Sequence, residues 1–296
     1  MPEIVKKVSL AESTRAGYQI GGEADFYLTA HNVSDIKFGL DFARDKNIPY
    51  FVLGNGCNVL ASDKGFHGII IDTRRIDEII VSENSIKAGA GAHISSFVRE
   101  AALAGFAGVE ELAGIPGTIG GGIVMNAGAF SQKISDKISQ ICIYDCDSGL
   151  ERIVSKEDVQ FEYRSSIFKK KNYIIIWANF LFTLKVAYGV LVSRQNEVLE
   201  KRKKSQPLEY RSCGSVFKNP PDSYAGKLIE QAGLKGFSVG DAQISEKHGN
   251  FIINKGNATA EDIRKIIAEV RKVIVSDFST QLEPELIFLG EFDTKI

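Results

Sequence analysis

Hydrophobic residues along the first two-thirds of the chain fall into short runs that predict strands. The runs at 50–53, 68–71, 78–81, 138–144 and 173–184 contain many β-branched and aromatic residues. Such runs, bounded by glycine, proline and polar residues, are typical of strands in a packed core. The run at 173–184 is the longest, and we expect it to form a buried strand.

Helical spacing is found between these runs. One predicted helix has Ser34 as its N-cap and Pro49 beyond its end. A later one, over 190–204, carries basic residues in its last turn and ends before Pro207. Between them lies a third helix, followed by Gly105 as its C-cap. Its apolar face consists of Ile94, Phe97, Val98, Ala101 and Ala102.

The last hundred residues predict a small unit with its own helices and strands. A short helix beginning near Ala225 ends at Gly233, and strands are expected over 250–254 and 286–289. Between the two strands, Thr259 and Asp262 have the spacing of a capping box at the start of a longer helix. We therefore predict an α+β fold, divided into a first region over 1–188 and a second over 189–296.

The most unusual stretch is 112–132, which has no charged residue. Its glycines and Pro116 make it a poor membrane-spanning helix. Glycine is favoured where the backbone has positive φ or approaches another group closely, so the stretch predicts main-chain amides that face an anion such as a pyrophosphate. A set of tight turns between short strands is the alternative. Its six glycines are Gly114, Gly117, Gly120, Gly121, Gly122 and Gly128.

Two further glycine turns come earlier in the chain, L-G-N-G-C-N at 53–58 and A-G-A-G-A at 88–92. Each follows a predicted strand, an arrangement that can direct amides at phosphate oxygens. Neither fits the dinucleotide fingerprint G-x-G-x-x-G, and neither fits the P-loop. The three turns together predict a phosphate-bearing cofactor bound by a different kind of site.

Charge and cysteine content narrow the class of protein. The 296 residues carry a formal net charge of −1, which favours neither a nucleic-acid nor a membrane partner. The cysteines form no C-x-x-C pair, so we expect free thiols in a reducing compartment and no metal site. The N-terminal residues contain no signal-peptide core. We therefore expect a soluble cytoplasmic protein with four free cysteines, Cys57, Cys142, Cys146 and Cys213.

Four polar residues are candidates for chemistry. Ser215 follows Gly214 in S-C-G-S-V-F-K-N-P-P; without G-x-S-x-G and a His–Asp pair, its hydroxyl suits proton transfer better than nucleophilic attack. A turn or capping role is the alternative for Ser215. Arg164 could equally form a surface ion pair, Glu285 could be a solvated edge residue, and His248 could be an exposed loop residue.

Seven ordered blocks support a more specific assignment. They are I-G-G-E-A-D at 20–25, L-G-N-G-C-N-V-L at 53–60, A-G-I-P-G-T-I-G-G-G-I-V-M-N-A-G-A at 113–129, Y-R-S-S-I-F at 163–168, C-G-S-V-F-K-N-P at 213–220, A-G-K-L-I-E-Q-A-G-L-K-G at 225–236 and H-G-N-F-I-I-N at 248–254. In these blocks the chain resembles the UDP-N-acetylenolpyruvoylglucosamine reductases, flavoenzymes that make UDP-N-acetylmuramate for the bacterial cell wall. The short interval between Trp177 and Pro207 resembles the shorter form of the family, which lacks an extra tyrosine-bearing loop.

The resemblance implies a fold, cofactors and site residues. It implies a two-subdomain FAD-binding region of the vanillyl-alcohol-oxidase type over 1–188, a substrate-binding domain over 189–296, non-covalent FAD, NADPH as hydride donor, and a monomer. Ser215 matches the serine that protonates the substrate, and Arg164 and Glu285 match the pair that stabilises its enolate-like intermediate. The matched substrate contacts are Arg202, Lys218, Asn219 and His248. The matched FAD contacts are Gly54, Asn55, Gly56, Cys57, Asn58, Gly89, Gly91, Pro116, Gly117, Thr118, Gly120, Gly121, Asn126, Ala127 and Gly128.

Four positions depart from the family pattern. Gln19 stands where arginine is usual, Cys57 where serine is usual, Ser131 where glycine is frequent, and Ser205 where lysine is frequent.

Two rival functions are an oxygen-using flavin oxidase, which often holds FAD covalently, and a non-catalytic nucleotide-binding or cell-wall regulatory protein. Serine, arginine and glutamate at all three matched catalytic positions argue against the non-catalytic alternative.

Overall fold

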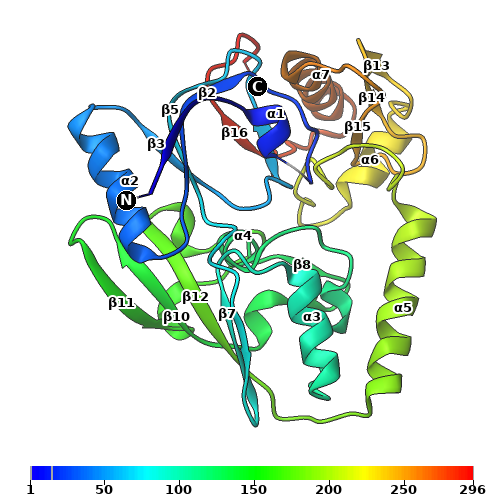
Figure 1. The fold of residues 1–296 in the computed structure, drawn as a ribbon. Coiled ribbons are helices and arrows are strands. Elements are labelled where there is room, and N and C mark those ends of the chain that lie inside the picture. Colours follow the sequence, from blue (N-terminus) through cyan, green and yellow to red (C-terminus); the bar gives the residue numbers. More distant parts are fainter. Residues whose placement is uncertain (1, 15, 296) are drawn as a thin grey trace. The chain divides into compact units, whose positions relative to one another are not determined.

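The computed structural model describes residues 2–14 and 16–295 and divides the chain into two compact units (Figure 1). The first unit comprises Met1–Val5, Tyr27–Asn55 and Gly68–Lys201. The second comprises Lys6–Phe26, Gly56–His67 and Arg202–Ile296. Two stretches from the first quarter of the chain thus belong to the same unit as the C-terminal residues.

The elements follow one another in mixed order. The helices are α1 (Leu10–Ser13), α2 (Val33–Asp45), α3 (Ile94–Leu103), α4 (Ile119–Val124), α5 (Tyr188–Ser205), α6 (Ala225–Gln231) and α7 (Ala260–Phe278), with short 3-10 turns at Glu110–Leu112, Ile134–Asp136, Glu157–Val159 and Ile167–Lys169. The strands are β1 (Ile4–Ser9), β2 (Glu23–Thr29), β3 (Tyr50–Leu53), β4 (Val59–Ala61), β5 (Phe66–Asp72), β6 (Ile79–Val81), β7 (Ser85–Gly89), β8 (Gly128–Ala129), β9 (Gln132–Lys133), β10 (Ile138–Asp145), β11 (Leu150–Ser155), β12 (Tyr173–Leu181), β13 (Ser238–Val239), β14 (Ala242–Ile244), β15 (Ile252–Asn254) and β16 (Ile287–Leu289).

An antiparallel sheet of five strands, in the order β11-β10-β12-β7-β6, lies in the first unit (Figure 1). Its central strand β12 buries the three isoleucines at 174–176 in succession, and alternate residues after them, because both faces of this part of the sheet are covered. The core includes Phe97 of α3, whose ring centroid lies 4.4 Å from that of Phe180. Phe106 stacks on Phe182 at 4.7 Å. Aromatic burial of this kind fixes α3 against the sheet.

A parallel pair in the first unit leads into the first glycine turn. β3 pairs with β5, with Tyr50 opposite Ile69, in a four-stranded sheet of order β1-β2-β5-β3. Directly after β5, Arg74 donates to both carboxylate oxygens of Asp72, and Tyr27 donates to the same carboxylate at 2.9 Å. Asp72 is 3% exposed. A buried charge that is paired and hydrogen-bonded in this way holds the end of β5 in one conformation.

The second unit packs α7 against the three-stranded antiparallel sheet β13-β14-β15 (Figure 1). The capping box at Thr259 and Asp262 is present, with hydrogen bonds of 3.0 Å in both directions. β16 pairs in parallel with β4, so that Ile287 lies opposite Val59. The buried face of α7 consists of Ala260, Ile263, Arg264, Ile266, Ile267, Val270 and Ile274.

Most predicted elements are confirmed, with small corrections at their ends. β3 has the predicted bounds, and α6 is followed by Gly233 at φ 71°. The predicted N-cap Ser34 is wrong: Asn32 caps α2, because its side chain accepts a hydrogen bond from the amide of Asp35 at 3.0 Å. The strand predicted over 173–184 ends at Leu181. No helix within the described residues is long and apolar enough to cross a membrane.

Candidate active site

The first glycine turn leaves a row of main-chain amides without backbone partners. Within the described chain, the amides of residues 54–58 donate to no backbone carbonyl, whereas the next amide, that of Val59, donates to the Gly56 carbonyl oxygen. Successive amides of this kind can form an anion-binding concavity. Cys57 does not oppose an anion, because burial raises the pKa of its thiol to about 11 and keeps it neutral at pH 7.

Residues 54–55 of the first glycine turn lie beside the other two predicted turns in the first unit, whereas residues 56–58 belong to the second unit. The Asn55 side-chain amide donates to the Pro116 carbonyl oxygen at 2.5 Å. The amide of Ile94 donates to Gly117 at 3.0 Å, and that of Gly120 donates to Ala90 at 2.8 Å. These bonds join the turns at 54–55, 89–92 and 116–121. Segments that are distant in the sequence therefore lie close together in the unit. The amides of residues 89–92 all donate to backbone carbonyls, so the second turn, unlike the first, does not direct its amides at an anion.

Gly91 is required by close packing in this region. A Cβ atom at Gly91 would overlap the Thr73 carbonyl oxygen and would lie 2.7 Å from the Cα of Arg74. Both obstacles are backbone atoms beside the Asp72–Arg74 pair, so they cannot move aside as a flexible side chain could. Gly91 therefore allows the turn after β7 to approach the end of β5.

Two buried polar atoms near these turns indicate a ligand. Within the described residues, Thr118 Oγ1 and Asn126 Oδ1 have no hydrogen-bond partner. Thr118 is 1% exposed and Asn126 is 4% exposed. An unpartnered buried polar atom costs about 1–3 kcal/mol, so both are expected to meet a bound group. The exposed amides and neutral polar atoms fit a cofactor that carries a pyrophosphate.

Arg164 lies in a tight turn of the first unit. Glu162 and Ser165 exchange two backbone hydrogen bonds around it. Arg164 has φ 54°, a backbone conformation that non-glycine residues adopt rarely and that often marks functional sites. Its guanidinium donates to the Gly128 carbonyl oxygen at 3.0 Å and lies 5.3 Å from the centre of the Tyr163 ring. The predicted catalytic arginine is therefore held beside a residue predicted to contact the cofactor.

Ser215 lies in an extended segment of the second unit. It forms an antiparallel bridge with Phe251 on one side, and on the other the amide of Glu285 donates to the Val216 carbonyl oxygen at 2.7 Å. Gly214 turns the chain immediately before it, with φ 74°. Among the described residues, the Ser215 hydroxyl has no hydrogen-bond partner, so it is available to a ligand.

The structure places the predicted residues Ser215 and Glu285 in neighbouring segments of the second unit. Asn58 connects the latter segment to the chain that follows the first glycine turn. Its side-chain amide donates to the Glu285 carbonyl oxygen at 3.0 Å, and its own carbonyl accepts from the amide of Ile287 at 2.9 Å. The side chain of Asn58 thus contacts protein backbone, while its main-chain amide has no backbone partner among the described residues.

Two of the predicted substrate contacts also have structural partners. Lys218 forms an ion pair with Glu283 at 2.6 Å. Its side chain is 18% exposed, whereas that of Glu283 is 68% exposed, so an anionic ligand could replace the glutamate. Asn219 accepts a hydrogen bond from the amide of Ala225 at 3.1 Å, at the start of α6. Arg202, in the last turn of α5, is 9% exposed.

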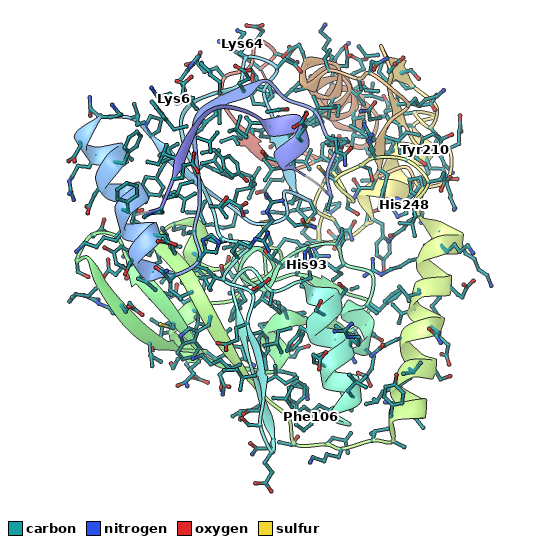
Figure 2. All side chains as sticks on the ribbon, in the orientation of Figure 1. Lys6, Lys64, His93, Phe106, Tyr210 and His248 are labelled. Carbon is teal, nitrogen blue, oxygen red and sulfur yellow. The ribbon has the colours of Figure 1, made fainter. Side chains whose placement is uncertain are left out.

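His248, labelled in Figure 2, belongs to the second unit and is half-buried. Burial lowers the pKa of its imidazole below the usual value of 6.5. Its Nδ1 accepts a hydrogen bond from the amide of Asn250 at 3.2 Å, so the neutral ring carries its proton on Nε2. Lys235 also disfavours protonation of His248, and Glu230, paired with Lys235 at 3.1 Å, favours it. Lys235 was not predicted from the sequence to influence His248, although it lies in the matched block 225–236.

Sequence comparisons identify the class of protein to which this architecture belongs. Residues 24–147 match the FAD binding domain family, and residues 206–289 match the family described as UDP-N-acetylenolpyruvoylglucosamine reductase, C-terminal domain. The chain is therefore an FAD-dependent oxidoreductase with an FAD-binding domain and an α+β C-terminal domain.

Full-length relatives identify the family. The chain is 42% identical to the UDP-N-acetylenolpyruvoylglucosamine reductase of Caldicellulosiruptor bescii, over 99% of this chain and 93% of the relative. It is 39% identical to that of Caldanaerobacter subterraneus, over 98% and 97%. The crystal structure of the reductase from Thermus caldophilus has a TM-score of 0.80 at 32% identity, covering 98% of this chain and 99% of that one. The chain belongs to the UDP-N-acetylenolpyruvoylglucosamine reductase family.

Proposed function

We infer that this protein reduces the enolpyruvyl ether of UDP-N-acetylglucosamine enolpyruvate to the lactyl ether of UDP-N-acetylmuramate, a step in peptidoglycan precursor synthesis. The observation that carries this inference is similarity to reductases of that name over nearly the whole chain. The region of clustered glycine turns and the available Ser215 hydroxyl support it from the structure. NADPH is the hydride donor implied by the family.

The chain's own residues would hold the flavin through uncharged groups. The amides of residues 54–58 and Thr118 Oγ1 would meet its pyrophosphate. Gly89, Gly91 and Gly120, whose own amides donate to backbone carbonyls, would allow neighbouring parts of the cofactor to approach the backbone closely. Bound there without a covalent link, FAD supplies the transfer of hydride from NADPH to the double bond of the substrate. Pro116, Gly117, Gly121, Asn126, Ala127 and Gly128 complete the proposed contact set.

Ser215 would complete the reduction by donating a proton. Addition of hydride to the terminal carbon of the enolpyruvyl group leaves negative charge next to the substrate carboxylate. The Ser215 O–H bond then breaks, and its proton forms a C–H bond at the adjacent carbon. The resulting serine alkoxide regains a proton from solvent. Oriented donation of this kind requires the hydroxyl to be held in one position.

Arg164 and Glu285 would stabilise the charge that develops on the substrate. A guanidinium can donate two parallel hydrogen bonds to a carboxylate, which becomes a better acceptor as negative charge accumulates. A carboxylate at Glu285 would repel that charge, so Glu285 must act in its protonated form or share a proton with the substrate. Arg202, Lys218, Asn219 and His248 would bind the anionic and polar parts of the UDP-sugar.

The proposal also assigns the two domains, the oligomeric state and the cellular location of the protein. We assign flavin binding to residues 1–188 and substrate binding to 189–296, and we expect a monomer in the cytoplasm. The oxygen-using flavin oxidase remains the alternative activity. It predicts that FAD precipitates with the denatured protein, whereas the reductase releases yellow FAD into the supernatant.

An absorbance experiment tests the function directly. Purified protein should show oxidised flavin bands that NADPH bleaches under anaerobic conditions. Addition of UDP-N-acetylglucosamine enolpyruvate should then restore the bands and yield one UDP-N-acetylmuramate for each flavin. Bleaching that only oxygen reverses would contradict the reductase assignment, and so would a preparation that binds no added FAD.

A further inference from the structure

One buried side chain, that of Asn250, holds the segment that carries Ser215. Asn250 is 4% exposed. Its Oδ1 accepts a hydrogen bond from the amide of Phe217 at 2.9 Å, and its Nδ2 donates to the carbonyl oxygen of the same residue at 2.8 Å. The side chain therefore satisfies both main-chain polar groups of Phe217, as a neighbouring strand would.

The backbone of Asn250 adds a third bond to the same segment. Its carbonyl oxygen accepts from the amide of Val216 at 2.9 Å. On the opposite edge, the amide of Glu285 donates to the Val216 carbonyl oxygen, and the amide of Lys218 donates to the Glu283 carbonyl oxygen. The segment 216–218 is thus bonded on both edges, and Asn250 supplies all three bonds to Val216 and Phe217 on its own edge.

We propose that Asn250 is a positioning residue for proton donation by Ser215. Gly214, at φ 74°, turns the chain immediately before Ser215, and the serine is held by its bridge to Phe251 and by the bonds of the segment 216–218 after it. Loss of the Asn250 amide would leave the amide and carbonyl of buried Phe217 unpaired, and the segment would shift to find other partners. A displacement of about 1 Å can slow an oriented reaction by about 10²-fold. This proposal rests on the proposed role of Ser215.

Asn254 offers a matched control in the same unit. It is 6% exposed, donates to the Tyr18 carbonyl oxygen at 3.2 Å and accepts from the amides of Gly256 and Ala258 at 2.9 and 3.1 Å. It is therefore a buried asparagine with three side-chain hydrogen bonds to backbone. None of these bonds reaches residues 215–218. Substitution of Asn254 measures the effect of losing such an asparagine without disturbing the Ser215 segment.

The test separates the two halves of the reaction in stopped-flow experiments on flavin-loaded protein. Asn250→Ala should be reduced by NADPH within about twofold of the wild-type rate, but its reoxidation by the enolpyruvyl substrate should slow at least about tenfold. The solvent deuterium isotope effect on reoxidation should increase, because proton donation becomes slower. Asn254→Ala should lower the melting temperature without slowing reoxidation more than about twofold.

Asn250→Asp provides a second variant if Asn250→Ala does not fold. It keeps the acceptor for the Phe217 amide and loses the donor to its carbonyl, so it should also slow reoxidation and raise the isotope effect. Normal reoxidation in a folded Asn250 variant would overturn the proposal, as would equal slowing in Asn254→Ala. Ser215→Ala is measured alongside. If Ser215→Ala reoxidises normally, the serine assignment itself fails; if only the Asn250 variants are normal, the serine assignment stands and the positioning role fails.

Discussion

The first unit contributes mainly backbone to its candidate site, whereas the second contributes a side chain. In the first, three turns are joined by main-chain hydrogen bonds and by one bond from the Asn55 side chain, and Gly91 allows backbone to approach backbone. In the second, Ser215 has no partner for its hydroxyl among the described residues, while the residues after it are bonded on both edges. Binding an anionic cofactor needs many fixed amides, whereas proton donation needs one fixed hydroxyl.

This difference predicts that substitutions in the two units will fail in different ways. Changes at the glycine turns should alter flavin content, because the backbone of these turns is proposed to bind the flavin. Changes at Ser215 should alter turnover and leave flavin content intact. Measuring flavin content and the two half-reactions separately therefore tests the comparison at each position.

The largest effect is expected for Ser215→Ala. The variant should keep FAD and should still be bleached by NADPH, while reoxidation by the enolpyruvyl substrate should fall by about 10²–10⁴-fold, the range for a lost general acid. Single-turnover absorbance measurements give both rates. Normal reoxidation would show that another group supplies the proton.

Gly91→Ala tests the backbone part of the comparison. Its Cβ would overlap the Thr73 carbonyl oxygen, so either the turn after β7 or the end of β5 must move. We expect destabilisation of about 3 kcal/mol and loss of flavin from the purified protein, measured by thermal melting and by the ratio of flavin to protein absorbance.

Gly214→Ala is the matched control for that experiment. Gly214 has φ 74°, but its Cβ would meet no heavy atom within 4 Å. The cost is therefore backbone strain alone, about 1–2 kcal/mol, and flavin content should be unchanged. If Gly91→Ala retained full flavin, or if Gly214→Ala lost it, the proposal that the glycine turns of the first unit determine flavin binding would be wrong.

Sequence patterns predicted local elements well because the interactions that stabilise them are local. The capping box at Thr259 and Asp262 joins residues three positions apart, and the apolar face of α7 repeats within a few turns. The predicted N-cap of α2 was wrong by two residues, which is also a local error. Asn32 and Ser34 are both good capping residues, and only the observed hydrogen bond from Asp35 distinguishes them.

The pairing of distant segments could not be predicted in this way. Residues 56–67 share a compact unit with the C-terminal residues, where Val59 pairs with Ile287. The bonds from Asn250 to Phe217 join residues 33 positions apart. No periodicity encodes such contacts, because they depend on which surfaces meet after the local elements form. Resemblance could identify Ser215, but not the asparagine that holds its segment.

Arg164→Lys is expected to have an intermediate effect. Lysine keeps the positive charge and the same cost of a positive φ, but its ammonium cannot form two parallel hydrogen bonds with a carboxylate. Loss of one charged hydrogen bond predicts an approximately tenfold slower reoxidation by substrate, with flavin reduction by NADPH unchanged. The Arg164→Lys rate is compared with that of Arg164→Gln, which removes the charge. Equal rates for wild type and Arg164→Lys would show that charge alone is sufficient.

The smallest predicted effect is a pH dependence of stability in the second unit. Burial lowers the pKa of folded His248 below 6.5, so the unfolded chain binds a proton there more readily than the folded one. The contribution of His248 to stability is therefore fully present above about pH 6.5 and is lost as the pH falls from there through the folded pKa. Thermal melting at pH 7.5 and 5.5 should show a smaller loss of stability for His248→Gln than for wild type. An identical loss in both would show that His248 titrates normally in the folded protein and that its surroundings, including Lys235, do not hold it neutral.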